Sequence, residues 1–141
     1  MGQRYDIVAS RNETYQLKLD YTDSNGTGIA LDTTDGATVF TLNDTNTYSS
    51  TGKVKIADST TSVPTNNETP GVFWFPGTPV GRVILHIPQA QFELTGTGKF
   101  GDLTLNTKYY YDIVATTTGA PILKVKLLSG YFTLTPGISD V

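Results

Sequence analysis

Short runs in which apolar and polar side chains alternate recur along this chain, and they limit the folds open to it more than any other feature. In the clearest run, Tyr15, Leu17, Leu19 and Tyr21 are separated by single polar residues. Successive side chains of a β-strand point to opposite faces, so this spacing predicts a strand with one buried face. Threonine, whose branched Cβ suits strands, is the commonest residue, with 24 copies. Both features predict a β-rich fold.

Further strands are predicted wherever similar runs lie between clusters of turn residues. The predicted strands cover residues 4–9, 13–21, 29–31, 37–43, 52–57, 82–87, 108–115, 122–128 and 130–135. Ser129 and Gly130 are predicted to form the turn between the last two. Pro88 suits the first turn of a helix, so at most one short helix is predicted, near residues 88–95.

No alternation of strands with long helices is present, and this excludes a parallel α/β sheet. We therefore expect a single domain over residues 1–141. Its predicted fold is an all-β, antiparallel β-sandwich of about eight to nine strands, Ig-like or jelly-roll-like, with a long irregular loop at about residues 58–81. The apolar faces predict a core that contains Tyr15, Leu17, Leu19, Val39, Val54, Ile56, Val83, Leu85, Ile87, Ile113, Val125, Leu127 and Leu134.

Charge and residue types exclude several classes of function. The formal net charge is −3, whereas a nucleic-acid-binding protein needs a basic face. Because the sequence contains no cysteine, disulfides, thiolate metal sites and cysteine nucleophiles are all excluded. Its apolar runs are far shorter than the ~18 residues that cross a bilayer. We expect no nucleic-acid partner, no membrane partner, no transmembrane segment and no signal peptide.

The sequence contains no recognisable set of catalytic residues. His86 is the only histidine, and the alternation in residues 82–87 places it opposite Val83, Leu85 and Ile87 on its strand. The motifs of serine hydrolases, zinc proteases and phosphate-binding loops are missing. We expect no catalytic residue, no metal, no cofactor and no enzymatic activity.

The aromatic run Phe73-Trp74-Phe75 is the first candidate for a binding surface. Pro70 and Pro76 flank it, and proline cannot donate a hydrogen bond within a sheet, so the run is predicted to lie in a loop or at an edge. Either the loop caps one end of the sandwich, or its rings form an exposed patch that contacts another subunit. The second alternative predicts that Trp74→Ala weakens assembly without unfolding the domain.

Three consecutive tyrosines form the second candidate. Tyr109, Tyr110 and Tyr111 fall in a predicted strand, so their rings must divide between its two faces. A ring on the outer face either packs against neighbouring strands of the same sheet or contacts a partner. Tyr109 and Tyr110 therefore join Phe73, Trp74 and Phe75 as interface candidates.

Strand and turn motifs at the two ends of the sequence form a recognisable pattern. The start, Arg11-Asn12-Glu13-Thr14-Tyr15, precedes a strand, an Asn-Gly turn and Ile29-Ala30-Leu31. The end holds a Tyr-Tyr-Asp strand at residues 109–115 and a closing Leu-x-Gly-x-aromatic strand at residues 128–136. Together these motifs resemble small β-sandwich domains of tailed-bacteriophage virion proteins, and the resemblance does not extend to about residues 44–81. The resemblance implies an Ig-like sandwich with a structural role in the baseplate, the tail or a head accessory, and brings no catalytic residues.

The predicted function is therefore a non-enzymatic structural protein of a phage particle. It would act through contacts with other virion proteins or with copies of itself, as a homo-oligomer or part of a larger assembly, and would be found in the virion after assembly in the host cytoplasm. The alternative is a carbohydrate-binding or adhesin-like sandwich module. In that case Trp74 and exposed tyrosines would stack on sugars, while Asn and Asp side chains would bind sugar hydroxyls.

Overall fold

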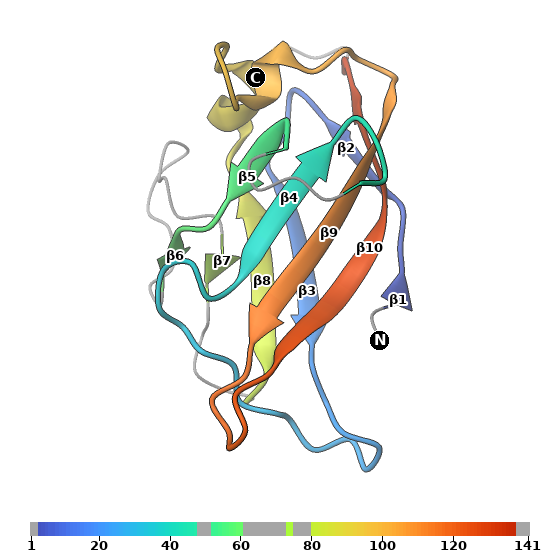
Figure 1. The fold of residues 1–141 in the computed structure, drawn as a ribbon. Helices are drawn as coiled ribbons and strands as arrows, with labels where there is room; N and C mark the ends of the chain where they lie inside the picture. The colour runs from blue at the N-terminus through green and yellow to red at the C-terminus, as the bar shows by residue number, and fades with distance from the viewer. Residues whose placement is uncertain (1–2, 48–51, 61–72, 75–79, 138–141) are drawn as a thin grey trace.

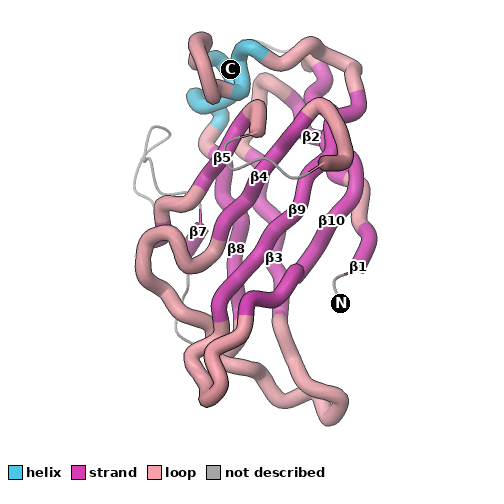
Figure 2. The backbone as a smooth tube through the Cα atoms, in the orientation of Figure 1, coloured by secondary structure: helices cyan, strands magenta, loops and turns pink. Residues whose placement is uncertain are grey.

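The fold is built almost entirely from β-strands arranged in two sheets (Figures 1 and 2). The computed structural model describes residues 3–47, 52–60, 73–74 and 80–137. Within these ranges there are ten strands and two short 3-10 helices, and no α-helix. No helix of this part of the chain is long and apolar enough to cross a membrane. The predicted β-rich fold is confirmed.

Sheet A contains the first and the last strands of the described residues. Its strands are β1 (Gln3–Arg4), β2 (Ile7–Ser10), β4 (Val39–Asn43), β5 (Val54–Ile56), β9 (Lys108–Thr116) and β10 (Lys124–Thr135). They lie in the order β1-β10-β9-β4-β5, with β2 also paired to β10. Both β1 and β2 run parallel to β10, while the other pairs are antiparallel. Sheet A is therefore mixed, and the prediction of a wholly antiparallel fold is wrong.

Sheet B is shorter and lies behind sheet A in Figure 1. Its order is β3 (Tyr15–Asp20), β8 (Arg82–Ile87), β7 (Phe73–Trp74) and β6 (Ser59–Thr60). Strands β3 and β8 pair antiparallel with Leu17 opposite Leu85. Strands β6 and β7 fall inside the range predicted as an irregular loop at about residues 58–81, and most of the remainder of that range lies outside the described residues.

The two sheets share one hydrophobic core, to which most of the predicted residues contribute. Val54, Val83, Leu85, Ile87, Ile113 and Leu134 are buried, while Tyr15, Leu17, Leu19, Ile56, Val125 and Leu127 are partly buried and pack against them. The prediction for Val39 is wrong. Its strand runs Val-Phe-Thr-Leu, and the larger Phe40 and Leu42 fill the core, which turns Val39 to the other face.

The connection between β8 and β9 closes one end of the core. A 3-10 helix (Gln89–Glu93) occupies the position of the predicted short helix, and a second one (Phe100–Asp102) follows it. Their buried rings, Phe92 and Phe100, meet edge to face with centroids 5.2 Å apart. Phe100 also lies 6.4 Å from Phe40 of β4, so these turns are anchored to sheet A by aromatic packing.

Residues 124–135 form one strand, where two strands with a turn at Ser129-Gly130 were predicted. Gly130 serves a close approach of two backbones. The Tyr5 amide donates a hydrogen bond to the Ser129 carbonyl oxygen at 2.8 Å. A Cβ on Gly130 would lie 2.3 Å from the Tyr5 carbonyl oxygen, far inside contact distance. The chain between β1 and β2 thus passes directly over this glycine.

Gly130→Ala is therefore expected to destabilise the protein by about 1–3 kcal/mol, because the added methyl must push the Tyr5 backbone away from β10. Urea denaturation monitored by tryptophan fluorescence would measure the change in the free energy of unfolding. Gly119→Ala is the matched control, since a methyl group added at Gly119 would meet nothing within 4 Å. Equal stability of the two variants would contradict the close approach.

Candidate functional site

The tyrosine run divides between the core and the outer face of sheet A. Tyr109 and Tyr111 are 5% and 4% exposed, whereas Tyr110 is half-buried on the outer side. The Thr104 amide donates to the Tyr109 hydroxyl oxygen at 2.8 Å, and the Tyr111 hydroxyl donates to the Tyr5 carbonyl at 2.5 Å. Burial is the main reason why the pKa of Tyr111 lies far above its ordinary value, so this donor keeps its proton. Tyr109 is a core residue, and its prediction as an interface residue is wrong.

Tyr110 packs beside Tyr131 of β10, its partner in the sheet register, with ring centroids 5.2 Å apart. Two cations lie over the Tyr131 ring. The Arg4 guanidinium carbon is 4.8 Å from its centroid, and the Lys108 Nζ is 5.3 Å from it. Such cation–π contacts hold the long basic side chains against the sheet. Neither Tyr131 nor these cations was singled out from the sequence, although alternation in β10 is the signal that places Tyr131 outside.

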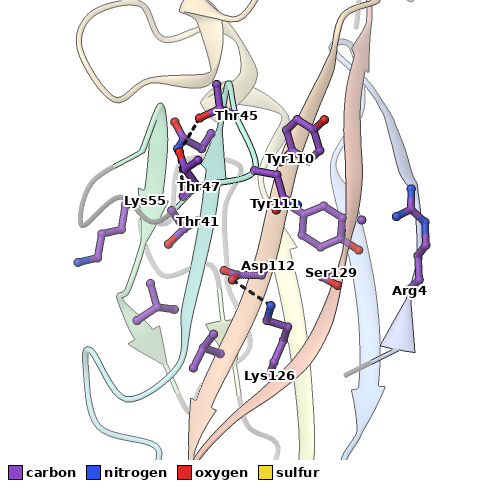
Figure 3. A pocket seen from close by; sticks show the side chains of 15 residues that line it. Arg4, Thr41, Thr45, Thr47, Lys55, Tyr110, Tyr111, Asp112, Lys126 and Ser129 are labelled. Carbon is purple, nitrogen blue, oxygen red and sulfur yellow. Dashed lines mark hydrogen bonds and ion pairs between the residues drawn. The ribbon is translucent and has the colours of Figure 1, made fainter. Parts of the chain in front are cut away.

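A hollow of about 510 Å³ lies on this outer face of sheet A (Figure 3). Its floor is formed by outward residues of β4, β9 and β10, and the loop at residues 45–47 forms one wall. The lining is mainly polar, and Tyr110 and Tyr111 are its aromatic residues. We name this surface the outer hollow. It is larger than the hollow of about 340 Å³ that lies beside the two 3-10 helices.

Asp112 lies at the centre of the outer hollow. In the sheet register it stands between Thr41 of β4 and Ser129 of β10. The Lys126 Nζ is 3.9 Å from its Oδ2, which is a long ion pair on a partly exposed surface (Figure 3). Burial raises the pKa of Asp112, and the attraction of Lys126 opposes that rise. The carboxylate is thus a partly desolvated charge with acceptor capacity left for a ligand.

The predicted interface run at residues 73–75 is described only in part. Phe73 and Trp74 form β7, which pairs with β8 on one side and β6 on the other. The backbone of Phe73 and Trp74 is therefore inside a sheet, and the prediction of a loop or edge is wrong for these two residues. Their side chains, and Phe75 altogether, lie outside the described residues, so the contact role predicted for them stays a prediction.

His86 is 8% exposed although its strand position faces away from the core. Its Nδ1 lies 2.7 Å from the Gln16 side-chain nitrogen on the neighbouring strand. Burial lowers the pKa of His86, which favours the neutral imidazole. Within the described part of the chain, no group of three or more histidine and acidic side chains is placed to hold a metal ion.

Three exposed aliphatic residues lie in or beside connections at one end of the strands. Figure 1 shows the β9–β10 connection and the start of β8 at the lower end of the molecule. Ile122 and Leu123, in the connection between β9 and β10, are 70% and 52% exposed, and Val80 before β8 is 50% exposed. Backbone hydrogen bonds link the segments at this end. The Thr118 amide donates to the Ala30 carbonyl oxygen, and the Tyr21 amide donates to the Gly81 carbonyl oxygen. We name Val80, Ile122 and Leu123 the apolar end. Residues 122–123 were predicted to begin a strand, so this surface was not anticipated.

Comparison with models of known protein families gives no match to this chain, and comparison with curated protein sequences gives none either. The phage-protein resemblance of the two sequence ends therefore stays a prediction.

Proposed function

We propose that this chain is a non-enzymatic structural protein of a tailed-phage particle, built as an Ig-like β-sandwich and acting through protein–protein contacts. Its place would be the baseplate, the tail or a head accessory. The resemblance at the two sequence ends supports this assignment. The exposed apolar end is the structural observation on which the proposed contacts rest.

Strand order supports the Ig-like assignment. In an Ig-like sandwich the last two strands lie beside the third strand in one sheet, and the second strand pairs with later strands in the other. Sheet A has the order β10-β9-β4-β5, and sheet B has β3-β8-β7. A tyrosine early in the penultimate strand that bonds to the backbone just upstream is a further mark of these domains. Tyr109 has this position and receives the Thr104 amide.

The apolar end supports the assembly role. Isolated exposed aliphatic residues are common, but Ile122 and Leu123 are adjacent and project from one connection. Val80 precedes Gly81, whose carbonyl oxygen accepts a hydrogen bond from the Tyr21 amide at the same end. Burying one such side chain against a partner contributes about 1.5–3 kcal/mol before association costs. Ile122 is the most exposed large apolar side chain in the described part of the chain, so this end gains free energy from being covered by a second subunit.

Ile122→Asp is expected to weaken self-association by about tenfold or more, because a charge replaces an apolar side chain that the contact would bury. Sedimentation equilibrium combined with light scattering would measure the change in dissociation constant. Val8→Asp is the matched control: Val8 is 66% exposed on β2, outside the apolar end. Both variants should keep the wild-type thermal midpoint, because neither side chain is buried.

A chain that stays monomeric at high concentration, or one whose association Val8→Asp disrupts as strongly as Ile122→Asp, would contradict this contact. The biological assignment has a separate test in the genes that flank this one. Neighbouring tail or capsid genes are expected, and a neighbourhood of metabolic genes would count against the phage assignment.

A further inference from the structure

The outer hollow differs in charge from the protein as a whole. The chain carries a formal net charge of −3, yet Arg4, Lys55 and Lys126 all line the hollow. Lys108 is outside the lining, and its Nζ lies over the Tyr131 ring, which packs beside Tyr110 of the lining. Asp112 is the one carboxylate among the described residues of the lining. This surface is thus a basic patch on an acidic protein, which is the arrangement that attracts an anionic partner.

The charges are ordered along one row that crosses the strands. The sheet register aligns, from one side to the other, Arg4, Ser129, Asp112, Thr41 and Lys55. Figure 3 shows Arg4 and Lys55 at opposite sides of this row, with Asp112 between them. Four strand spacings of ~4.8 Å separate the two cationic ends by ~19 Å, the length of about six extended residues. Positive charge therefore marks the ends of the row and negative charge its centre.

The existing contacts of these basic side chains leave them able to bind an anion. Lys55 has no ion pair in the described part of the chain and is exposed. The ion pairs of Arg4 with Asp6 at 3.6 Å and of Lys126 with Asp112 at 3.9 Å are long, and all four side chains are at least partly exposed. Exposed pairs of this kind contribute little and exchange readily for a better anion. The Thr41 hydroxyl, which lies in the row, offers a hydrogen bond to a ligand, and the Tyr110 ring of the lining offers apolar contact.

We propose that the outer hollow binds an extended acidic segment of a partner protein, which crosses the strands of sheet A along this row. Carboxylates at the two ends of the segment meet Arg4 and Lys55. A neutral stretch passes over Asp112, whose own carboxylate repels an acid placed there and accepts a hydrogen bond from the backbone of the segment. This surface is separate from the apolar end, so it gives the proposed assembly protein a second, ionic contact.

The experiment uses two fluorescent peptides of equal composition and charge. One, Glu-Glu-Ser-Gly-Ser-Gly-Glu-Glu, carries its acids at both ends, and the other, Ser-Gly-Glu-Glu-Glu-Glu-Ser-Gly, carries them in the centre. Fluorescence anisotropy with the full chain at low ionic strength should show tighter binding of the first peptide. Added salt should weaken that binding, because exposed charges are screened. Lys55→Glu should weaken it by about two- to fivefold or more.

Lys99→Glu is the control, since Lys99 is exposed in the turns between β8 and β9, outside the lining. It should change binding of the first peptide far less than Lys55→Glu does. Equal affinity for both peptides, equal effects of the two variants, or binding of an acidic oligosaccharide in place of both peptides would overturn the proposal. Ile122→Asp should leave peptide binding unchanged, so failure at the apolar end and failure at the outer hollow are told apart.

Discussion

Phe40→Ala is expected to lower the free energy of unfolding by about 3–5 kcal/mol, because it removes the ring at the centre of the core and leaves a cavity that its neighbours cannot fill. Phe40 is 0% exposed. Its ring centroid lies 5.7 Å from that of Tyr111, 6.0 Å from that of Phe132 and 6.4 Å from that of Phe100. These rings come from β9, β10 and the second 3-10 helix, so one substitution loosens three parts of the fold.

Chemical denaturation monitored by circular dichroism would measure this loss. Val39→Ala is the matched control, because Val39 is the preceding residue of the same strand and faces the outer hollow. Its cost should be about 1 kcal/mol or less, as expected for a side chain outside the core. Similar losses of stability in Phe40→Ala and Val39→Ala would contradict the assignment of Phe40 to the core face of β4 and of Val39 to its outer face.

Leu85→Ala is expected to cost about 2–5 kcal/mol, while Leu17→Ala should cost distinctly less. The two leucines are opposite each other on β8 and β3, and alternation alone predicts the same burial for both. Leu85, at 0% exposed, lies on an inner strand between β3 and β7. Leu17 is only partly buried, because β3 is the edge strand of sheet B. Truncating Leu17 therefore removes less area from the core and leaves a smaller cavity.

Paired urea titrations of Leu85→Ala and Leu17→Ala, compared at their denaturation midpoints, would separate the two costs. The loss of stability in the double variant should differ from the sum of the two single losses by a coupling energy, because the side chains are neighbours across one pair of strands. A larger loss for Leu17→Ala than for Leu85→Ala would contradict the placement of β3 at the edge of sheet B.

Period-two alternation was a reliable guide wherever it was unbroken. Strands β3, β8 and β9 begin and end within two residues of their predicted bounds, and their core faces are those that alternation predicts. The reason is local: a one-residue shift would move every apolar side chain of such a strand to solvent. Where the run was mixed, as in β4, residue size decided which side faced the core, and the sequence pattern misplaced Val39.

The binding surfaces were less predictable than the strands. Tyr110 lies on the outer face, whereas Tyr109 has the same alternation phase as Tyr111 and Ile113, which places it on the core face of β9. The outer hollow depends on the alignment of β1, β10, β9, β4 and β5, and these strands are far apart in the sequence. Arg4 and Lys55 could be assigned to one row only after the pairing of all five strands was known.

Local sequence was enough to establish that this chain forms β-strands and which side of the regular strands is apolar, because both follow from side-chain spacing and residue type over a few neighbouring residues. The parallel course of β1 and β2 beside β10, and the backbone crossing that Gly130 permits where a turn was expected, came from the packing of the whole chain. So did the hollow around Asp112 that basic side chains from β1, β5 and β10 line. These features arise from contacts between residues up to 126 positions apart, as in the bond from Thr135 to Ala9, and no local pattern encodes such contacts.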